Sequence, residues 1–178
     1  MVSRDRPTVK TVLIEDDAGF AKTLAMLLDD APFFKHQVQT AKFLEQAKQL
    51  IAASKPELII LDLILPNGRG VEVLHEIRKI APKFEVALVV ITGMADEDIE
   101  WRALDALADG FILKGREGAG EMLRVFDHTV LGLRSVKRLP VLPKGTAKEV
   151  RDLMKDCEAN PNFAPFPEDK LPKVKPIA

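Results

Sequence analysis

Five short runs, four of them rich in apolar residues and one, residues 36–40, a weaker strand candidate, alternate along the chain with segments whose apolar residues recur at helical spacing. The runs predict strands at residues 9–14, 36–40, 58–61, 86–91 and 111–113. The helical segments follow each run, around residues 20–28, 44–51, 71–80, 96–107 and 122–133. Because the connections are short, this alternation predicts an α/β fold with a doubly wound, five-stranded parallel sheet and helices on both faces.

The third run is apolar at four consecutive positions, residues 58–61, and is followed at once by Asp62. Such an uninterrupted run is typical of a strand buried on both faces. An ionised carboxylate directly after it is costly to desolvate unless another group compensates its charge. Since the next residues, Pro66-Asn67-Gly68, predict a turn, we expect Asp62 at the carboxyl edge of the sheet, where open α/β sheets bind ligands.

Polar side chains also follow the other strong runs: Glu15, Asp16 and Asp17 after the first, Thr92 after the fourth and Lys114 after the fifth. The carboxyl ends of parallel strands share one edge of a sheet, so we expect these groups close to Asp62. Crowded carboxylates favour a bound cation, and oxygen ligands suit Mg²⁺. A lysine ammonium pairs with an anion such as a phosphoryl group, and an aspartate can act as a nucleophile. Asp17 directly precedes a helical segment, so its expected role is that of an N-cap.

Four segments, VLIEDD, LIILDLILPNGRG, VVITG and DGFILK, together resemble the motifs of the receiver domain of bacterial response regulators. The resemblance covers about residues 8–133 and implies a flavodoxin-like receiver fold. By this resemblance Asp62 is the phosphoacceptor. Glu15 and Asp16 resemble the acidic pair, which implies that Asp16 binds Mg²⁺ directly and that Glu15 acts through water. The backbone carbonyl of Ile64 is implied as a further ligand, beside Asp62 itself.

The same resemblance assigns roles around the phosphoryl group. Thr92 would hydrogen-bond to it, Lys114 would pair with it, and Phe111 would be the aromatic switch that turns inward when Thr92 moves. The sequence departs from the family at Gly115, because the family usually has a proline after its lysine, joined through a cis peptide bond. We therefore expect a trans bond between Lys114 and Gly115.

The texture of the sequence changes near residue 138, so we expect a receiver domain at residues 1–138 and a proline-rich extension at residues 139–178. Seven of the twelve prolines lie in that extension. Residues 146–149 form a capping-box pattern, and apolar residues follow at i, i+3, i+4 and i+7, which predicts a short amphipathic helix. Residues 1–133 carry 16 basic and 21 acidic side chains, whereas residues 134–178 carry 10 and 6. We expect this basic tail to pack on a receiver, its own or that of a second copy.

These features predict a response regulator that accepts a phosphoryl group on Asp62 from a histidine kinase or a phosphotransfer protein. It would signal through contact with a downstream protein, with a homodimer as one arrangement, and would not be an enzyme beyond slow self-dephosphorylation. One alternative is a transcriptional regulator whose basic tail binds DNA; however, no helix-turn-helix pattern appears. Another is a Mg²⁺-dependent phosphatase of the haloacid dehalogenase type, which needs an aspartate where Ile64 stands.

The composition indicates where such a chain would act. A net charge of −1 gives no global sign of nucleic-acid or membrane binding. The start of the sequence lacks the apolar stretch of a signal peptide, and no segment approaches the ~20 apolar residues of a membrane span. The single cysteine, Cys157, excludes an internal disulfide. We therefore expect a cytoplasmic protein.

Overall fold

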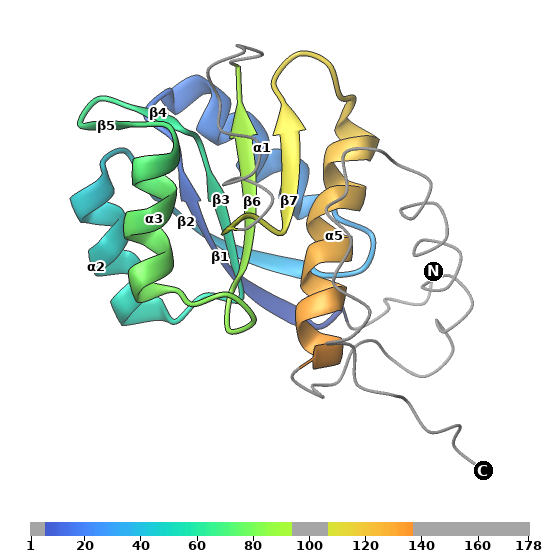
Figure 1. Cartoon of the computed structure of the whole chain (residues 1–178). Coiled ribbons are helices and arrows are strands. Elements are labelled where there is room, and N and C mark those ends of the chain that lie inside the picture. The colour runs from blue at the N-terminus through green and yellow to red at the C-terminus, as the bar shows by residue number, and fades with distance from the viewer. Residues whose placement is uncertain (1–5, 94–106, 137–178) are drawn as a thin grey trace.

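The computed structural model describes residues 6–93 and 107–136, and these form an α/β layered domain (Figure 1). Its centre is a parallel sheet of five strands in the order β2-β1-β3-β6-β7. The strands are β1 (Thr8–Ile14), β2 (Lys35–Ala41), β3 (Leu58–Leu61), β6 (Ala87–Thr92) and β7 (Gly110–Leu113). The predicted doubly wound sheet is confirmed, and each predicted strand is found within two residues of its expected bounds.

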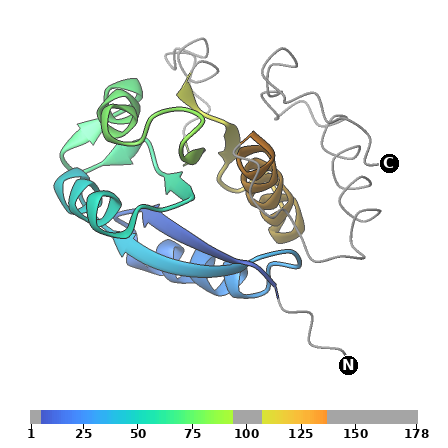
Figure 2. The ribbon, with the colours of Figure 1, turned by 90° about the horizontal axis from the view of Figure 1, so that it is seen from below.

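Helices cover both faces of the sheet (Figures 1 and 2). The helices are α1 (Ala18–Asp29), α2 (Leu44–Ser54), α3 (Val71–Ile80) and α5 (Ala119–Val136). The apolar side chains of α1 and α5 belong to one core cluster, and those of α2 and α3 belong to a second cluster on the opposite face. Residues 96–106 of the predicted fourth helix (residues 96–107) and the whole extension at residues 139–178 lie outside the described residues.

Strand β3 explains why its sequence is apolar at every position. Leu58 and Ile60 belong to the cluster under α1 and α5, whereas Ile59 and Leu61 belong to the cluster under α2 and α3. All four side chains are fully buried. Each contributes roughly 1.5–3 kcal/mol of hydrophobic stabilisation. The chain that carries Asp62 is therefore fixed from both sides.

A short antiparallel hairpin follows β3 and was predicted only as a turn. Its strands, β4 (Ile64–Leu65) and β5 (Gly68–Arg69), are two residues long. A Cβ atom at Gly68 would lie 2.7 Å from Cγ2 of Val73, so the hairpin packs closely against α3 only because position 68 lacks a side chain. The hairpin begins two residues after Asp62 and borders the carboxyl edge of the sheet.

A buried ion pair fixes the start of β7. Nη2 of Arg78 on α3 donates to Oδ2 of Asp109 at 2.7 Å, and the same oxygen accepts the amide of Leu88 at 2.9 Å. Both side chains are buried. Because Asp109 directly precedes β7, these contacts anchor the strand whose far end leads to Lys114.

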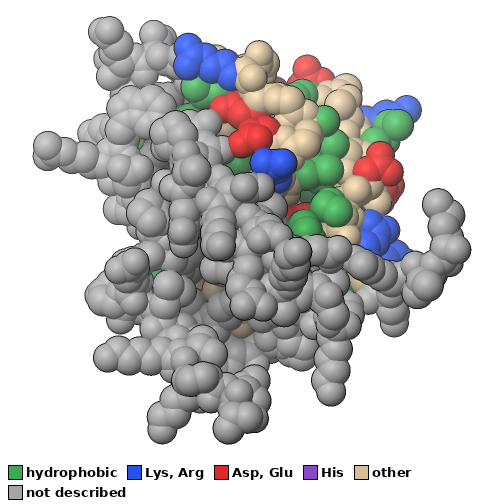
Figure 3. Space-filling view, turned by 90° about the vertical axis from the view of Figure 1, so that its right-hand side faces the viewer, with side chains coloured by type: hydrophobic (Ala, Val, Ile, Leu, Met, Phe, Trp, Pro, Cys, Tyr) green, Lys and Arg blue, Asp and Glu red, His purple; other side chains and the backbone are tan. Residues whose placement is uncertain are grey.

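In the part of the surface that Figure 3 colours, basic and acidic side chains are interspersed among hydrophobic ones. Within residues 6–93 and 107–136, no helix is long and apolar enough to cross a membrane.

Candidate functional site: an acidic cluster at the carboxyl edge of the sheet

Backbone hydrogen bonds bring the polar residues that follow three strands to one edge. The amide of Glu15 donates to the carbonyl of Ala41 at 2.9 Å, and the amide of Asp62 donates to the carbonyl of Ile14 at 2.9 Å. The amide of Lys114 donates to the carbonyl of Thr92 at 2.8 Å. The sheet ladder thus continues one residue beyond each strand. The sequence-based expectation that these side chains meet is confirmed for Glu15, Asp62 and Lys114.

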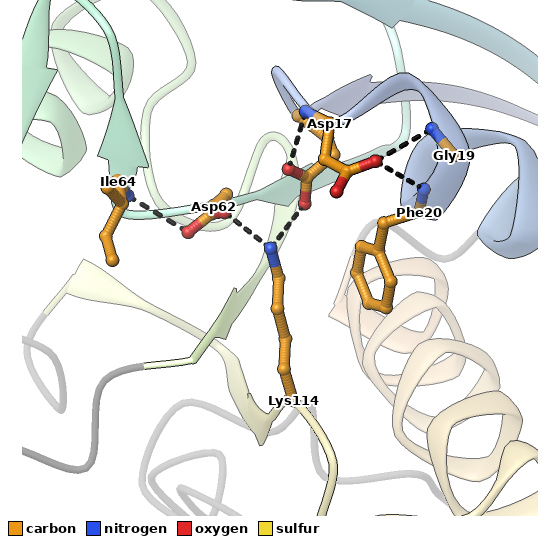
Figure 4. Close-up of polar contacts among 7 residues, drawn as sticks. Asp17, Gly19, Phe20, Asp62, Ile64 and Lys114 are labelled. Atoms are coloured by element: carbon orange, nitrogen blue, oxygen red, sulfur yellow. Dashed lines mark hydrogen bonds and ion pairs between the residues drawn. The ribbon is translucent and has the colours of Figure 1, made fainter.

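The ammonium of Lys114 bridges two buried carboxylates (Figure 4). Its Nζ lies 2.7 Å from Oε2 of Glu15 and 2.6 Å from Oδ2 of Asp62. Glu15 is 1% exposed and Asp62 is 3% exposed. Charges buried to this degree are stable only when they are paired and hydrogen-bonded, and Lys114 supplies both.

Burial and pairing act in opposite directions on the titration of this site. Burial raises the pKa of Glu15, and this effect exceeds the lowering caused by its hydrogen bonds to Lys114 and to the amide of Asp17. For Lys114, burial alone would lower the pKa, but the hydrogen bonds and charges of Asp62 and Glu15 outweigh it and raise the pKa. Lys114 is therefore held firmly in its charged form.

Three carboxylates form a group with the donor chemistry of a divalent-cation site. One ligand oxygen from each of Glu15, Asp16 and Asp62 lies within 4.8 Å of the others, and Asp16 is exposed to solvent. The amide of Ile64 donates to Oδ1 of Asp62 at 3.0 Å and fixes the orientation of that carboxylate (Figure 4). Oxygen ligands with open access to water suit Mg²⁺, which takes few protein carboxylates and keeps several waters.

Asp17 has the capping role expected from the sequence. Its Oδ1 accepts the amides of Gly19 at 2.8 Å and Phe20 at 2.9 Å, and these bonds lower its pKa. Its own amide donates to Oε1 of Glu15 at 3.1 Å. The start of α1 therefore fixes Oε1 of Glu15, while Lys114 pairs with Oε2.

The two residues expected to act as a switch lie on neighbouring strands. Thr92 is the last residue of β6 and is fully buried. Phe111 on β7 is the register partner of Val90, and it is partly buried against the cluster under α2 and α3. Residues two apart in a strand share a face, so Thr92 and Phe111 belong to the same side of the sheet.

The backbone after Lys114 follows the expected trans geometry, because no cis peptide bond occurs among the described residues. Gly115 has φ = +82°, in a region that residues with a side chain rarely adopt. The departure from the family proline therefore produces a glycine turn directly beside the site.

Phe20 is a site residue that the sequence reasoning missed. The Nζ atom of Lys114 lies 4.5 Å from the centroid of the Phe20 ring, within the range of a cation–π interaction. In the sequence Phe20 is only the first apolar residue of the stripe on α1. Its position four residues after Asp16 gives no signal for a contact with a lysine on another strand.

The order of the strands, together with the acidic cluster and lysine at their carboxyl edge, defines a flavodoxin-like α/β domain with an acidic site at that edge. The sequence model described as response regulator receiver domain matches residues 11–123, more than half of the chain. This chain belongs to the response regulator receiver family.

Two curated relatives are transcriptional regulators by name. The phosphate regulon transcriptional regulatory protein PhoB of Pseudomonas aeruginosa is 30% identical over 106 residues, which cover 59% of this chain and 45% of PhoB. The KDP operon transcriptional regulatory protein KdpE of Escherichia coli K12 is 32% identical over 111 residues, which cover 62% of this chain and 46% of KdpE. The chain spans less than half the length of these relatives.

Solved receiver structures share the fold. The response regulator domain of Thermotoga maritima CheB superimposes with a TM-score of 0.58 at 24% identity, covering 69% of this chain and 96% of that domain. A response regulator receiver domain from Clostridium thermocellum gives a TM-score of 0.59 at 22% identity, covering 68% and 94%. At these identities the similarity shows the fold.

Proposed function

We propose that this receiver accepts a phosphoryl group on Asp62 from a phosphohistidine of a histidine kinase or phosphotransfer protein. The observation that carries the proposal is the pairing of Asp62 with Lys114 at 2.6 Å, inside a group of three carboxylates within 4.8 Å. A nucleophile, a cation for the incoming anion and oxygen ligands for a metal then lie at one edge of the sheet.

The transfer itself is a simple displacement. One carboxylate oxygen of Asp62 attacks phosphorus, and a P–O bond forms while the P–N bond to the donor imidazole breaks. The electron pair of that bond stays on the imidazole nitrogen, which takes up a proton from solvent. Lys114 leaves Oδ2 of Asp62 and pairs with a phosphoryl oxygen. Its positive charge then stabilises the negative charge of the phosphoryl group during transfer.

The residues present fit a Mg²⁺ ion, because the donors are carboxylates and one of them, Asp16, faces solvent. Asp16 and Asp62 would hold the ion together with the carbonyl of Ile64, and Glu15 would act through water. When bound, the ion would supply positive charge to offset the negative charge of the phosphoryl oxygens.

The output is proposed to be a change of protein–protein contacts. Thr92 would hydrogen-bond to the phosphoryl group, and Phe111 would turn inward behind it. Their shared side of the sheet and the partial exposure of Phe111 support this coupling. The chain would thus be a signalling module whose own chemistry is limited to slow self-dephosphorylation. The domain is proposed to end near residue 138, and residues 139–178 would form an extension.

Mass spectrometry of the full chain after incubation with acetyl phosphate and Mg²⁺ tests the proposal. We expect one phosphoryl group on the wild-type protein, none on Asp62→Asn and none when the metal is chelated. Asp29→Asn, which changes an exposed carboxylate at the end of α1, is the matched control and should be labelled normally. Labelling of Asp62→Asn to the wild-type level would contradict the proposal.

DNA binding is a second candidate function, supported by the names of PhoB and KdpE as transcriptional regulators. The basic residues 134–178 would have to supply the contacts. A mobility-shift assay at increasing salt tests this directly, because binding through phosphate contacts weakens steeply with salt concentration.

A further inference from the structure

The Lys114 ammonium has three described side-chain contacts, and the aromatic ring of Phe20 is the uncharged one among them. Nζ of Lys114 lies 4.5 Å from the ring centroid, while Glu15 and Asp62 accept its hydrogen bonds at 2.7 and 2.6 Å. An ammonium has three N–H donors, so it can contact both carboxylates and a ring face together. Figure 4 shows Phe20 beside the lysine chain, on the side away from Ile64.

The ring is well fixed. The amide of Phe20 donates to Oδ1 of Asp17 at 2.9 Å in the N-cap of α1, and its side chain packs partly buried against the core cluster under α1 and α5. Lysine, by contrast, is a flexible chain of four methylene groups. The residue after it, Gly115, has the greatest backbone freedom of any residue type. Restraint on the position of the ammonium therefore has to come from side-chain contacts.

The charged contacts of Lys114 change during the proposed reaction, whereas the ring does not. Asp62 would become an acyl phosphate and Glu15 would turn towards a hydrated metal ion, so both carboxylates would release the ammonium. A ring face attracts a cation through its quadrupole without competing for the metal or for the phosphoryl group.

We propose that Phe20 is a positioning residue that holds the Lys114 ammonium for the incoming phosphoryl group. This inference rests on the proposed function of Asp62. It makes the start of α1 part of the phosphotransfer site through a cation–π contact and not only through the Asp17 cap.

The test is the initial rate of Asp62 labelling by acetyl phosphate with Mg²⁺, together with the melting temperature, for the full chain. Phe20→Leu should slow labelling roughly three- to tenfold, and Phe20→Tyr, which keeps the ring, should stay close to wild type. Phe33→Leu is the matched control, because Phe33 is also partly buried against the same cluster. It should lower the melting temperature about as much without changing the rate.

A double-mutant cycle separates positioning from general damage. In a Lys114→Met background, Phe20→Leu should cause no further loss of rate. Wild-type labelling of Phe20→Leu, equal loss in Phe20→Tyr, or an undiminished loss in the Lys114→Met background would each overturn the inference while leaving Asp62 as the phosphoacceptor. Absence of labelling at Asp62 in the wild-type protein would overturn the proposed function, and the inference with it.

Discussion

Lys114 and Asp62 are 52 positions apart in sequence, and their side chains meet at 2.6 Å. The same ammonium also lies 2.7 Å from Glu15. One lysine therefore offsets two buried acids from two other strands. In the resting protein the charge of Lys114 is a structural counter-ion for these two acids. In the proposed reaction the same charge pairs with the phosphoryl group.

Lys114→Met tests the structural half of this role. The substitution keeps most of the side-chain length but leaves Glu15 and Asp62 without their cation. Losing one partner of a fully buried ion pair costs ~3–5 kcal/mol, and we expect about 2 kcal/mol here because Lys114 is partly exposed. Mg²⁺ should stabilise the variant more than the wild type, since the metal no longer competes with the ammonium. Chemical unfolding with and without Mg²⁺ measures both effects.

Lys48→Met is the control for that substitution. Lys48 also contacts two carboxylates, Glu45 at 3.1 Å and Glu76 at 3.2 Å, but these acids lie at the surface. Exposed ion pairs contribute little, so the free energy of unfolding should change much less than for Lys114→Met and should not depend on Mg²⁺. Equal effects of the two substitutions would contradict the account of Lys114.

A second prediction concerns the lifetime of the phosphorylated protein. In the receiver family, side chains two positions after the phosphoacceptor and two after the threonine help to orient the hydrolytic water; here these are Ile64 and Met94. Ile64 is 37% exposed, and its hydrocarbon side chain has no hydrogen-bonding group; Met94 lies outside the described residues. The aspartyl phosphate should therefore be long-lived for a receiver.

Ile64→Asn should shorten that lifetime roughly three- to tenfold, less than the ~10²–10⁴ of a positioned general base, because an amide only orients the water. Ile64→Val should leave the lifetime unchanged. Decay of phosphorylated protein followed after removal of the donor gives both values. Fast wild-type decay that Ile64→Asn does not alter would be evidence against the prediction.

A third prediction is a pH-dependent stability that arises far from the site. Asp127 on α5 is fully buried, 3.9 Å from Nε2 of His36, and burial raises the pKa of its carboxyl. The folded state thus favours the protonated acid, and stability should fall as the pH rises from the usual range of aspartate through the raised value. Asp127→Asn cannot ionise. Its stability relative to wild type should rise over the same range, by about 1.4 kcal/mol for each pKa unit of the shift.

Urea unfolding from about pH 4, near the ordinary aspartate pKa of ~3.9, to about pH 8 in steps of ~1 unit measures this slope. Asp29→Asn, which removes an exposed carboxylate, is measured alongside as the control. A pH-independent difference in stability between Asp127→Asn and the wild type would contradict the prediction.

A fourth prediction concerns residues 139–178. The capping box and apolar stripe of the predicted helix need an apolar surface, since an isolated helix of that length is marginal in water. We expect truncation after Arg138 to lower the melting temperature or to change the number of chains per particle in solution. If the oligomeric state, the melting temperature and the partner affinity are unchanged in both phosphorylation states, the extension is a linker.

The parts of the fold that the sequence predicted are those with strong local patterns. The run at β3 is apolar at every position because both faces are buried, and this placed Asp62 at the sheet edge correctly. The edge strand β2 gave a weaker signal, since only some of its side chains are buried. Ile80 fits the apolar spacing of α3 yet is 43% exposed, because the helix ends there and its last turn leaves the core.

The features that the sequence did not predict are short elements and contacts between residues far apart in the sequence. The strands of the β4–β5 hairpin are too short to show a period. The contact between Phe20 and Lys114 joins an apolar residue of one helix to a lysine after another strand, and periodicity describes only which face of an element is buried. The roles proposed for Asp62, Glu15 and Lys114 come from the resemblance of the motifs to the family, whereas the hydrogen bonds among these side chains required the structure.

The bond between Glu15 and Lys114 spans 99 positions, so the last strand of the described sheet completes the site that its β1 strand begins. Closing so long a loop in a parallel sheet is entropically costly, and non-local contacts of this kind form slowly in general. A nascent chain that ends before β7 carries two neighbouring acids without this counter-charge, and their mutual repulsion opposes closure of the edge. In the proposed function, Asp62 can therefore become competent only in a chain that extends through Lys114 and has folded as far as β7.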